Sequence, residues 1–172
     1  MGKIITQTPR LIIREFEIAD TQAVFAFNSD PSVTRYTGDA GMVKTPEDAA
    51  NVIENIWLAE YAKYGYGRWA LVLKETEEVI GFCGFKYETR IMATDIGYRL
   101  LPRHWGRGYA TEAMRACLQY ARTHMALDQV VGDAVVENTA SINVLLKLGL
   151  EYQAQYQEDG VTLNRYHMRL KA

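Results

Sequence analysis

Apolar residues along the chain follow two patterns, and each pattern indicates a different kind of element. Short runs rich in β-branched and aromatic residues predict strands. These runs cover residues 10–16, 68–73, 79–87, 94–101, 129–135, 151–158 and 161–170. Longer segments with apolar residues three and four positions apart predict helices. These segments cover residues 20–27, 45–63, 109–125 and 138–148.

Local signals support the helix over residues 45–63. Thr45 and Pro46 are followed by two acidic residues, which is typical of a helix start. The apolar spacing within this segment predicts one buried face made of Ala49, Val52, Ile53, Ile56 and Trp57. Residues 29–44 and 102–108 show neither pattern, so we expect loops there.

The predicted elements follow the order β-α-α-β-β-β-α-β-α-β-β. A chain of 172 residues fits one domain. We therefore expect a single α/β domain over residues 1–172, with a core over about residues 9–170. It would contain one mixed, mostly antiparallel sheet with helices on both faces.

Composition narrows the class of protein. The formal net charge is −2, with 48% hydrophobic and 23% charged residues, which is typical of a globular domain. A near-neutral chain disfavours a nucleic-acid coat, and no apolar run approaches the roughly 20 residues of a membrane helix. Cys83 and Cys117 lack C-x-x-C spacing and the histidines do not cluster, so we expect buried free thiols and no metal. We expect a cytoplasmic protein, monomeric or homodimeric, with no nucleic-acid or membrane partner.

Candidate chemistry concentrates where residues 94–101 lead through a glycine-containing loop into the helix over residues 109–125. The first N–H groups of a helix have no internal partners and carry partial positive charge. Gly106 and Gly108 allow the backbone to approach a ligand closely. The pattern is neither a Walker loop nor a complete G-x-G-x-x-G, since Thr111 takes the third position. A plain connecting turn is the alternative, but residues 99–122 carry a net charge of +4, which favours a pyrophosphate site.

Two blocks of this sequence resemble the GCN5-related N-acetyltransferase superfamily, and within it the ribosomal-protein N-terminal (Rim-type) branch. The first block is Ile96-Gly97-Tyr98, Pro102 and residues 105–113. The second is residues 138–143 with residues 147–150. The order of elements also matches over residues 10–170.

The resemblance implies a splayed sheet that binds acetyl-CoA between the strands over residues 94–101 and 129–135. Backbone groups of Tyr98, Arg99 and Leu100 would pair with the pantetheine arm. The loop and first helical turn would hold the pyrophosphate through Trp105, Gly106, Arg107, Gly108, Tyr109, Ala110 and Thr111.

The second block supplies two further candidates for cofactor binding. Asn138 matches the family asparagine near the pantetheine arm, and a helix cap is its alternative interpretation. Asn143 is the second candidate, with an exposed helical amide as its alternative.

The catalytic candidates follow from the resemblance and from one departure from it. Many members carry a tyrosine that protonates the departing thiolate, but Leu145 stands at that position and cannot donate a proton. Ser141 is the candidate acid, because the Rim-type branch has a serine in this block; a hydroxyl in the first turn of a helix is the alternative. Asp95 is the candidate base, acting through water, and a solvated carboxylate is the alternative.

The identity of the acceptor rests only on the resemblance to the Rim-type branch. Rim-type similarity implies a protein N-terminal α-amine, and a small amine (an amino acid, polyamine or antibiotic) is the alternative. A CoA-binding sensor without turnover is the alternative outside enzymes. Residues 1–85 carry a net charge of −4 against +2 for the remainder, which favours a cationic acceptor. Possible walls of an acceptor pocket are Arg35, Tyr36, Trp57, Tyr64, Tyr66, Trp69 and Tyr87.

Overall fold

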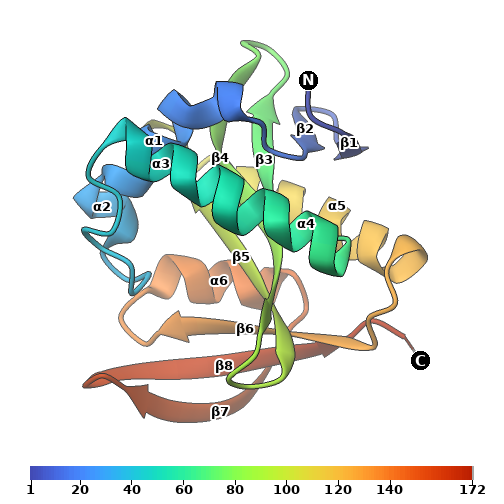
Figure 1. The fold of residues 1–172 in the computed structure, drawn as a ribbon. Helices are drawn as coiled ribbons and strands as arrows, with labels where there is room; N and C mark the ends of the chain where they lie inside the picture. The colour runs from blue at the N-terminus through green and yellow to red at the C-terminus, as the bar shows by residue number, and fades with distance from the viewer. Residues whose placement is uncertain (172) are drawn as a thin grey trace.

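The strands pair into one sheet of eight strands within residues 1–171, the part of the chain that the computed structural model describes (Figure 1). Residue 172, the last of the predicted domain, lies outside the described residues. The strand order is β1-β2-β3-β4-β5-β6-β8-β7. The strands are β1 (Ile4–Gln7), β2 (Leu11–Arg14), β3 (Arg68–Leu73), β4 (Glu78–Glu88), β5 (Ala93–Leu100), β6 (Gln129–Val135), β7 (Glu151–Glu158) and β8 (Val161–Arg169). The predicted mixed, mostly antiparallel sheet is confirmed.

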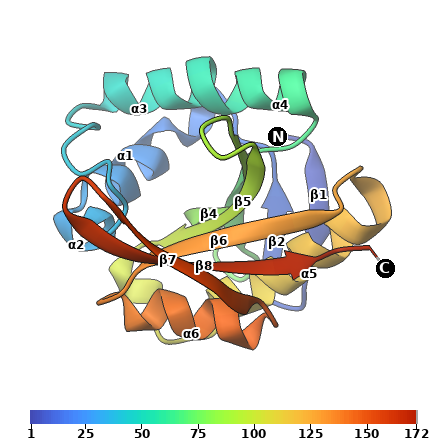
Figure 2. The same ribbon diagram turned by 90° about the horizontal axis from the view of Figure 1, so that it is seen from below.

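Helices cover both faces of this sheet, as predicted (Figure 2). Helices α1 to α4 lie on one face, and α5 and α6 lie on the other. The helices are α1 (Thr21–Ser29), α2 (Pro31–Thr34), α3 (Pro46–Val52), α4 (Leu58–Tyr64), α5 (Tyr109–His124) and α6 (Thr139–Lys147). Short 3-10 turns cover Ile18–Asp20 and Pro102–His104.

Strands β5 and β6 form the parallel neighbours of the sheet, whereas the other neighbouring strands are antiparallel. Across the described residues, their register consists of the pair Asp95 and Val131. The two strands then diverge, so the sheet is splayed at its centre (Figure 1). The sequence similarity implied this opening between the same two strands.

Two apolar clusters hold the helices on the sheet. One cluster packs α5 against Trp69, Phe85 and other strand residues, and it buries the predicted inward face Ala113, Met114, Cys117, Leu118 and Ala121. The other packs α1 and α3 against Phe82, with the rings of Phe16 and Trp57 stacked at 4.3 Å. Cys83 and Cys117 are buried free thiols, as expected.

Three local features differ from the predictions. Strand β1 was not predicted, because it is a short, half-exposed edge strand. The expected loop over residues 29–44 contains the short helix α2. A π-helical segment, Ile53–Trp57, interrupts the predicted helix over residues 45–63, and its wider turn keeps residues four apart on the buried face. Ile56, predicted to be buried, is therefore 42% exposed.

Candidate functional site

A cleft of about 620 Å³ occupies the opening between β5 and β6. Side chains alternate along β5, so Asp95, Gly97 and Arg99 face the side of α1 to α4, whereas Ile96 and Tyr98 face α5 and α6. The cleft contains residues of both sets. It therefore joins the two faces of the sheet, so that two ligands can meet in it from opposite sides.

The loop after β5 leaves backbone N–H groups free at the start of α5. Gly106 and Gly108 have φ values of 72° and 79°, in the left-handed region that favours glycine. Gly108 is the N-cap of α5, and within residues 1–171 no side chain caps this end. The first intrahelical bond runs from the Glu112 N–H to the Gly108 carbonyl oxygen at 3.0 Å. The amides of residues 109–111 are thus available to an anion at the positive end of a 16-residue helix.

Side chains around this loop fix its path. The Trp105 indole N–H donates to the Leu100 carbonyl oxygen at 2.9 Å. Tyr109 is buried beneath the Arg10 guanidinium, which lies 4.4 Å from its ring centroid. Arg107 remains exposed. The loop therefore has space and free donors for a pyrophosphate, and the residues present fit the phosphates of acetyl-CoA.

The start of α6 brings three of the candidate residues together. Asn138 is the N-cap, and its Oδ1 accepts from the Ser141 N–H at 3.3 Å. The Tyr98 hydroxyl donates to the Ser141 carbonyl oxygen at 2.9 Å and lies 3.0 Å from Ser141 Oγ. Burial raises the pKa of the Tyr98 phenol. The cap interpretation of Asn138 is confirmed, and Asn138, Tyr98 and Ser141 all line the cleft.

Leu145 and Asn143 lie further along α6. Leu145 lines the cleft but is 2% exposed, and its Cδ2 lies 2.6 Å from where a Cβ on Gly132 would be. Asn143 is exposed on α6 and is not among the residues that line the cleft, whereas Asn138 is.

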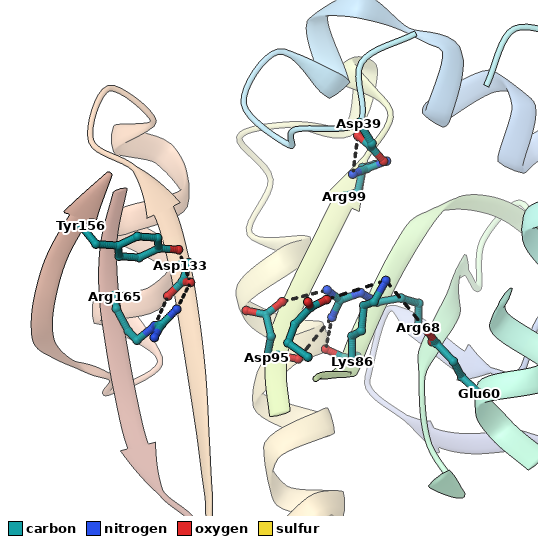
Figure 3. Close-up of polar contacts among 11 residues, drawn as sticks. Asp39, Glu60, Arg68, Lys86, Asp95, Arg99, Asp133, Tyr156 and Arg165 are labelled. Carbon is teal, nitrogen blue, oxygen red and sulfur yellow. Dashed lines mark hydrogen bonds and ion pairs between the residues drawn. The ribbon is translucent and has the colours of Figure 1, made fainter. Parts of the chain in front are cut away.

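Asp95 lies on β5 and is paired with a cation rather than solvated alone. Arg68 Nη2 donates to Asp95 Oδ2 at 2.9 Å (Figure 3). Burial raises the pKa of the Asp95 carboxyl to about 6. The positive charge of Arg68 opposes this rise, whereas the negative charges of Asp133 and Glu88 add to it. The carboxylate thus changes charge near neutral pH, as a general base needs.

Arg68 reaches Asp95 across two glycines of the sheet. Gly84 and Gly97 are register partners on β4 and β5. A Cβ on Gly97 would lie 2.5 Å from Arg68 Cζ, and Arg68 Nη1 donates to the Gly84 carbonyl oxygen at 3.2 Å. Sequence analysis did not identify Arg68. The signal for Arg68 in the sequence is the pair of glycines in neighbouring predicted strands. Because glycine has no side chain, two adjacent glycines leave space for a long side chain to cross the sheet.

The side chain of Arg99 points away from the phosphate loop. Arg99 Nη1 donates to Asn28 Oδ1 at 2.6 Å. It also donates to Asp39 Oδ2 at 3.1 Å (Figure 3). Arg103 also pairs outside its own segment, with Glu78. The net charge of +4 over residues 99–122 thus overstated the positive charge near the phosphate loop, because acids from residues 1–85 neutralise these two arginines.

A second polar cluster stands across the opening from Asp95. Asp133 on β6 accepts two hydrogen bonds from Arg165, each at 2.8 Å, and one from the Tyr156 hydroxyl at 2.6 Å. Figure 3 shows Asp95 and Asp133 on facing sides of the gap. No sequence pattern indicated this cluster, because its members come from three strands that pair only in the folded sheet.

The aromatic residues proposed as walls of a pocket are mostly part of the core. Trp57, Trp69 and Tyr66 are buried in the two apolar clusters. Tyr36 lines the cleft. The α1 to α4 side of the cleft therefore combines ion pairs with the rings of Tyr36, Phe82 and Tyr156.

Comparison with known proteins identifies the family. The sequence profile described as an acetyltransferase (GNAT) domain matches residues 10–151. The chain belongs to the GNAT acetyltransferase family. It is 32% identical over 158 residues to the uncharacterized N-acetyltransferase YoaA of Bacillus subtilis (strain 168), covering 91% of this chain and 85% of YoaA. The predicted acetyl-CoA-dependent acetyltransferase activity is thereby confirmed at the level of the family.

Solved GNAT structures share the fold closely. A GNAT-family acetyltransferase from Bacillus anthracis has a TM-score of 0.82 at 25% identity, covering 95% of this chain and 97% of that one. RimL, a ribosomal L7/L12 α-N-protein acetyltransferase solved with coenzyme A, has a TM-score of 0.84 at 17% identity, covering 97% and 98%. Spermidine N-acetyltransferase from Vibrio cholerae has a TM-score of 0.76 at 16% identity, covering 95% and 97%. The last two likenesses concern the fold alone.

Within residues 1–171, no set of three or more His, Cys, Asp or Glu side chains is arranged to hold a metal ion. None of the helices in this part of the chain has both the length and the apolar character needed to span a membrane.

Proposed function

We propose that this GNAT enzyme transfers the acetyl group of acetyl-CoA to the α-amine of a polypeptide N-terminus. The observation that supports this acceptor is the cleft on the α1 to α4 side, where the ion pairs Arg68–Asp95 and Arg165–Asp133 lie beside aromatic rings. The peptide groups of an extended chain need hydrogen-bond partners, and these charged side chains supply both donors and acceptors along the cleft. The likeness of fold to RimL agrees with this acceptor.

The donor would occupy the α5 and α6 side of the cleft. In this proposal the amides of residues 108–111 hold the pyrophosphate, and the free backbone edge of residues 98–100 pairs with the pantetheine arm. Asn138 would contact the same arm. The residues that line the cleft include Tyr98, Arg99, Asn138 and Ser141.

The acceptor would meet the donor at the parallel pair of β5 and β6. The thioester supplies an activated acetyl group, so the protein needs to position the amine, remove one proton and return one proton to the leaving sulfur. Asp95 takes the proton from the amine through a water molecule. Ser141 returns a proton, and the Tyr98 hydroxyl beside it orients the Ser141 side chain.

A release assay tests the proposed acceptor. Free CoA is measured with three sets of acceptors: peptides with a free α-amine, polyamines and single amino acids. We expect release with peptides and weak release with the other two sets. Selective release with polyamines or amino acids would overturn the proposed acceptor. Tight binding of acetyl-CoA without release across all sets would instead identify a sensor.

A further inference from the structure

Arg99 combines deep burial with access to the cleft. Its side chain is 9% exposed and lines the acceptor side, on the same face of β5 as Asp95. Among the described residues, Arg99 Nε has no hydrogen-bond partner. A buried guanidinium is costly unless an anion pairs with it, and the Nη atoms of Arg99, rather than its buried Nε, hold the carboxylate of Asp39.

The partners of Arg99 differ in how firmly they are held. Asn28 is a buried residue of α1, and its Oδ1 accepts from Arg99 Nη1 at 2.6 Å. Asp39 makes longer contacts of 3.1 and 3.3 Å and is 45% exposed. Asp39 lies in the connection between α2 and α3, flanked by Gly38 and Gly41, both with φ of 79°. Asn28 thus fixes the guanidinium, whereas Asp39 can be replaced.

Two other arginines on this side of the cleft have acidic partners that are held firmly. Arg68 and Arg165 bind Asp95 and Asp133 at 2.8 to 2.9 Å, and both acids belong to central strands of the sheet. Asp39, in contrast, also accepts a hydrogen bond from Thr37 of its own loop. It keeps a partner when it leaves Arg99.

We propose that Arg99 binds a carboxylate of the acceptor, and that Asp39 occupies this position until the acceptor enters. This inference rests on the proposed function, because it extends the acceptor from any N-terminus to one followed by an acidic side chain. Asp95 and Arg99 are four residues apart on a strand, which spans about 13 Å. An extended peptide advances about 3.3 to 3.6 Å per residue. With its amine near Asp95, about four steps along the peptide bring its fourth or fifth side chain to Arg99.

Matched peptides test this assignment. Each peptide has a free α-amine, an amidated C-terminus and either Glu or Gln at one of residues two to five. The measured quantity is the ratio of kcat/KM for the Glu peptide to kcat/KM for the Gln peptide. For the wild-type enzyme we expect a ratio of about 10 to 100 when the residue is fourth or fifth, because the carboxylate forms charge-assisted hydrogen bonds. General losses of activity cancel in this ratio.

Two variants should change the ratio in opposite directions. Arg99→Met should bring it to about 1, because the cation is lost. Asp39→Asn should raise it by roughly threefold to tenfold through a lower KM for Glu peptides, because the competing carboxylate is gone. A purely structural ion pair would instead affect Glu and Gln peptides alike in both variants. If Arg99→Met fails to fold, as judged by thermal unfolding, the ratio measured for Asp39→Asn still decides whether Arg99 binds the acceptor carboxylate.

Arg90→Met is the matched control, since Arg90 also lines the cleft and pairs with Glu158 but is 71% exposed. It should leave the ratio near its wild-type value. A wild-type ratio near 1 with good turnover of peptides would overturn the role of Arg99 and leave the proposed function standing. If no peptide is acetylated, the proposed acceptor fails. The same variants, tested with a carboxylate-bearing small amine and its carboxamide, then decide the role of Arg99.

Discussion

Burial and the neighbouring Arg68 act in opposite directions on the pKa of Asp95, on the α1 to α4 side of the cleft. Burial raises the pKa of Asp95 to about 6, and Arg68 opposes this rise. Asp95 was predicted from sequence because it precedes a recognisable Ile-Gly-Tyr motif. Arg68 is distant from that motif in the chain, so its contact with Asp95 depends on the pairing of β3, β4 and β5.

The pH dependence of turnover tests this pair. With saturating acceptor, kcat should rise with pH around a midpoint of about 6, because Asp95 must lose its proton to act as the base. Arg68→Met removes a group that lowers the pKa of Asp95, so the midpoint should move to higher pH. Rate profiles at matched ionic strength measure both midpoints. An unchanged or lower midpoint in Arg68→Met would contradict this assignment.

Ser141 provides a second prediction at the scale of single residues. Ser141→Ala should lower kcat by about 100-fold, with little change in the affinity for acetyl-CoA, because a positioned proton donor is lost. Thr139→Ala is the control, since Thr139 is an exposed hydroxyl in the same first turn of α6. Steady-state kinetics and a binding titration separate the two effects. A normal kcat in Ser141→Ala would remove this residue from the mechanism.

Among the elements, those whose ends carry local signals were predicted best. Thr45 caps α3 through a capping box, and Gly108 directly precedes α5, as the sequence indicated. The π-helical segment was not predictable, because apolar residues at helical spacing do not show where an extra residue enters a turn. Strand β1 was missed for a similar reason, since its pairing with β2 decides its conformation.

Gly108→Asp tests the element that would bind phosphate. It should weaken the binding of acetyl-CoA by at least about 10-fold, because a carboxylate would face the phosphates at the start of α5. Gly160→Asp is the matched control: Gly160 has a nearly identical φ of 78° but lies in the turn between β7 and β8. Calorimetric titration with acetyl-CoA compares the two folded variants. Equal affinities would exclude the loop as the phosphate site.

At the scale of the whole molecule, charges counted along the chain did not predict how those charges pair in the fold. Residues 1–85 are acidic overall and were expected to face the acceptor. In the fold, Asp39 and Glu78 from this half pair with Arg99 and Arg103 from the other half. Counting charges along a segment misses such pairs, because they form between elements that come together only in the complete fold.

Hydrogen exchange tests how strands β1 to β5 are joined to strands β6 to β8. Strand β5 meets β6 through the register pair Asp95 and Val131 in the part of the chain described, whereas β4 and β5 are paired from Gly81 to Glu88 on β4. Amides of β6 that face β5 should therefore exchange faster than those of β4 in the free enzyme, whereas β6 amides paired with β8 stay protected. Added CoA should slow exchange in β5 and β6 more than in β3. Equal protection of all four strands, with no local effect of CoA, would contradict a donor site in the opening.

The divergence of β5 from β6 also bears on how the enzyme can evolve. In the proposed arrangement, main-chain groups of residues 98–100 serve the donor, and main-chain groups are the same for every amino acid except proline. Side chains on this strand are then free to change with the acceptor. At Arg99 the main chain would bind the donor, whereas the side chain would select the acceptor. New acceptor specificities could therefore arise by substitution on β5 without loss of the donor.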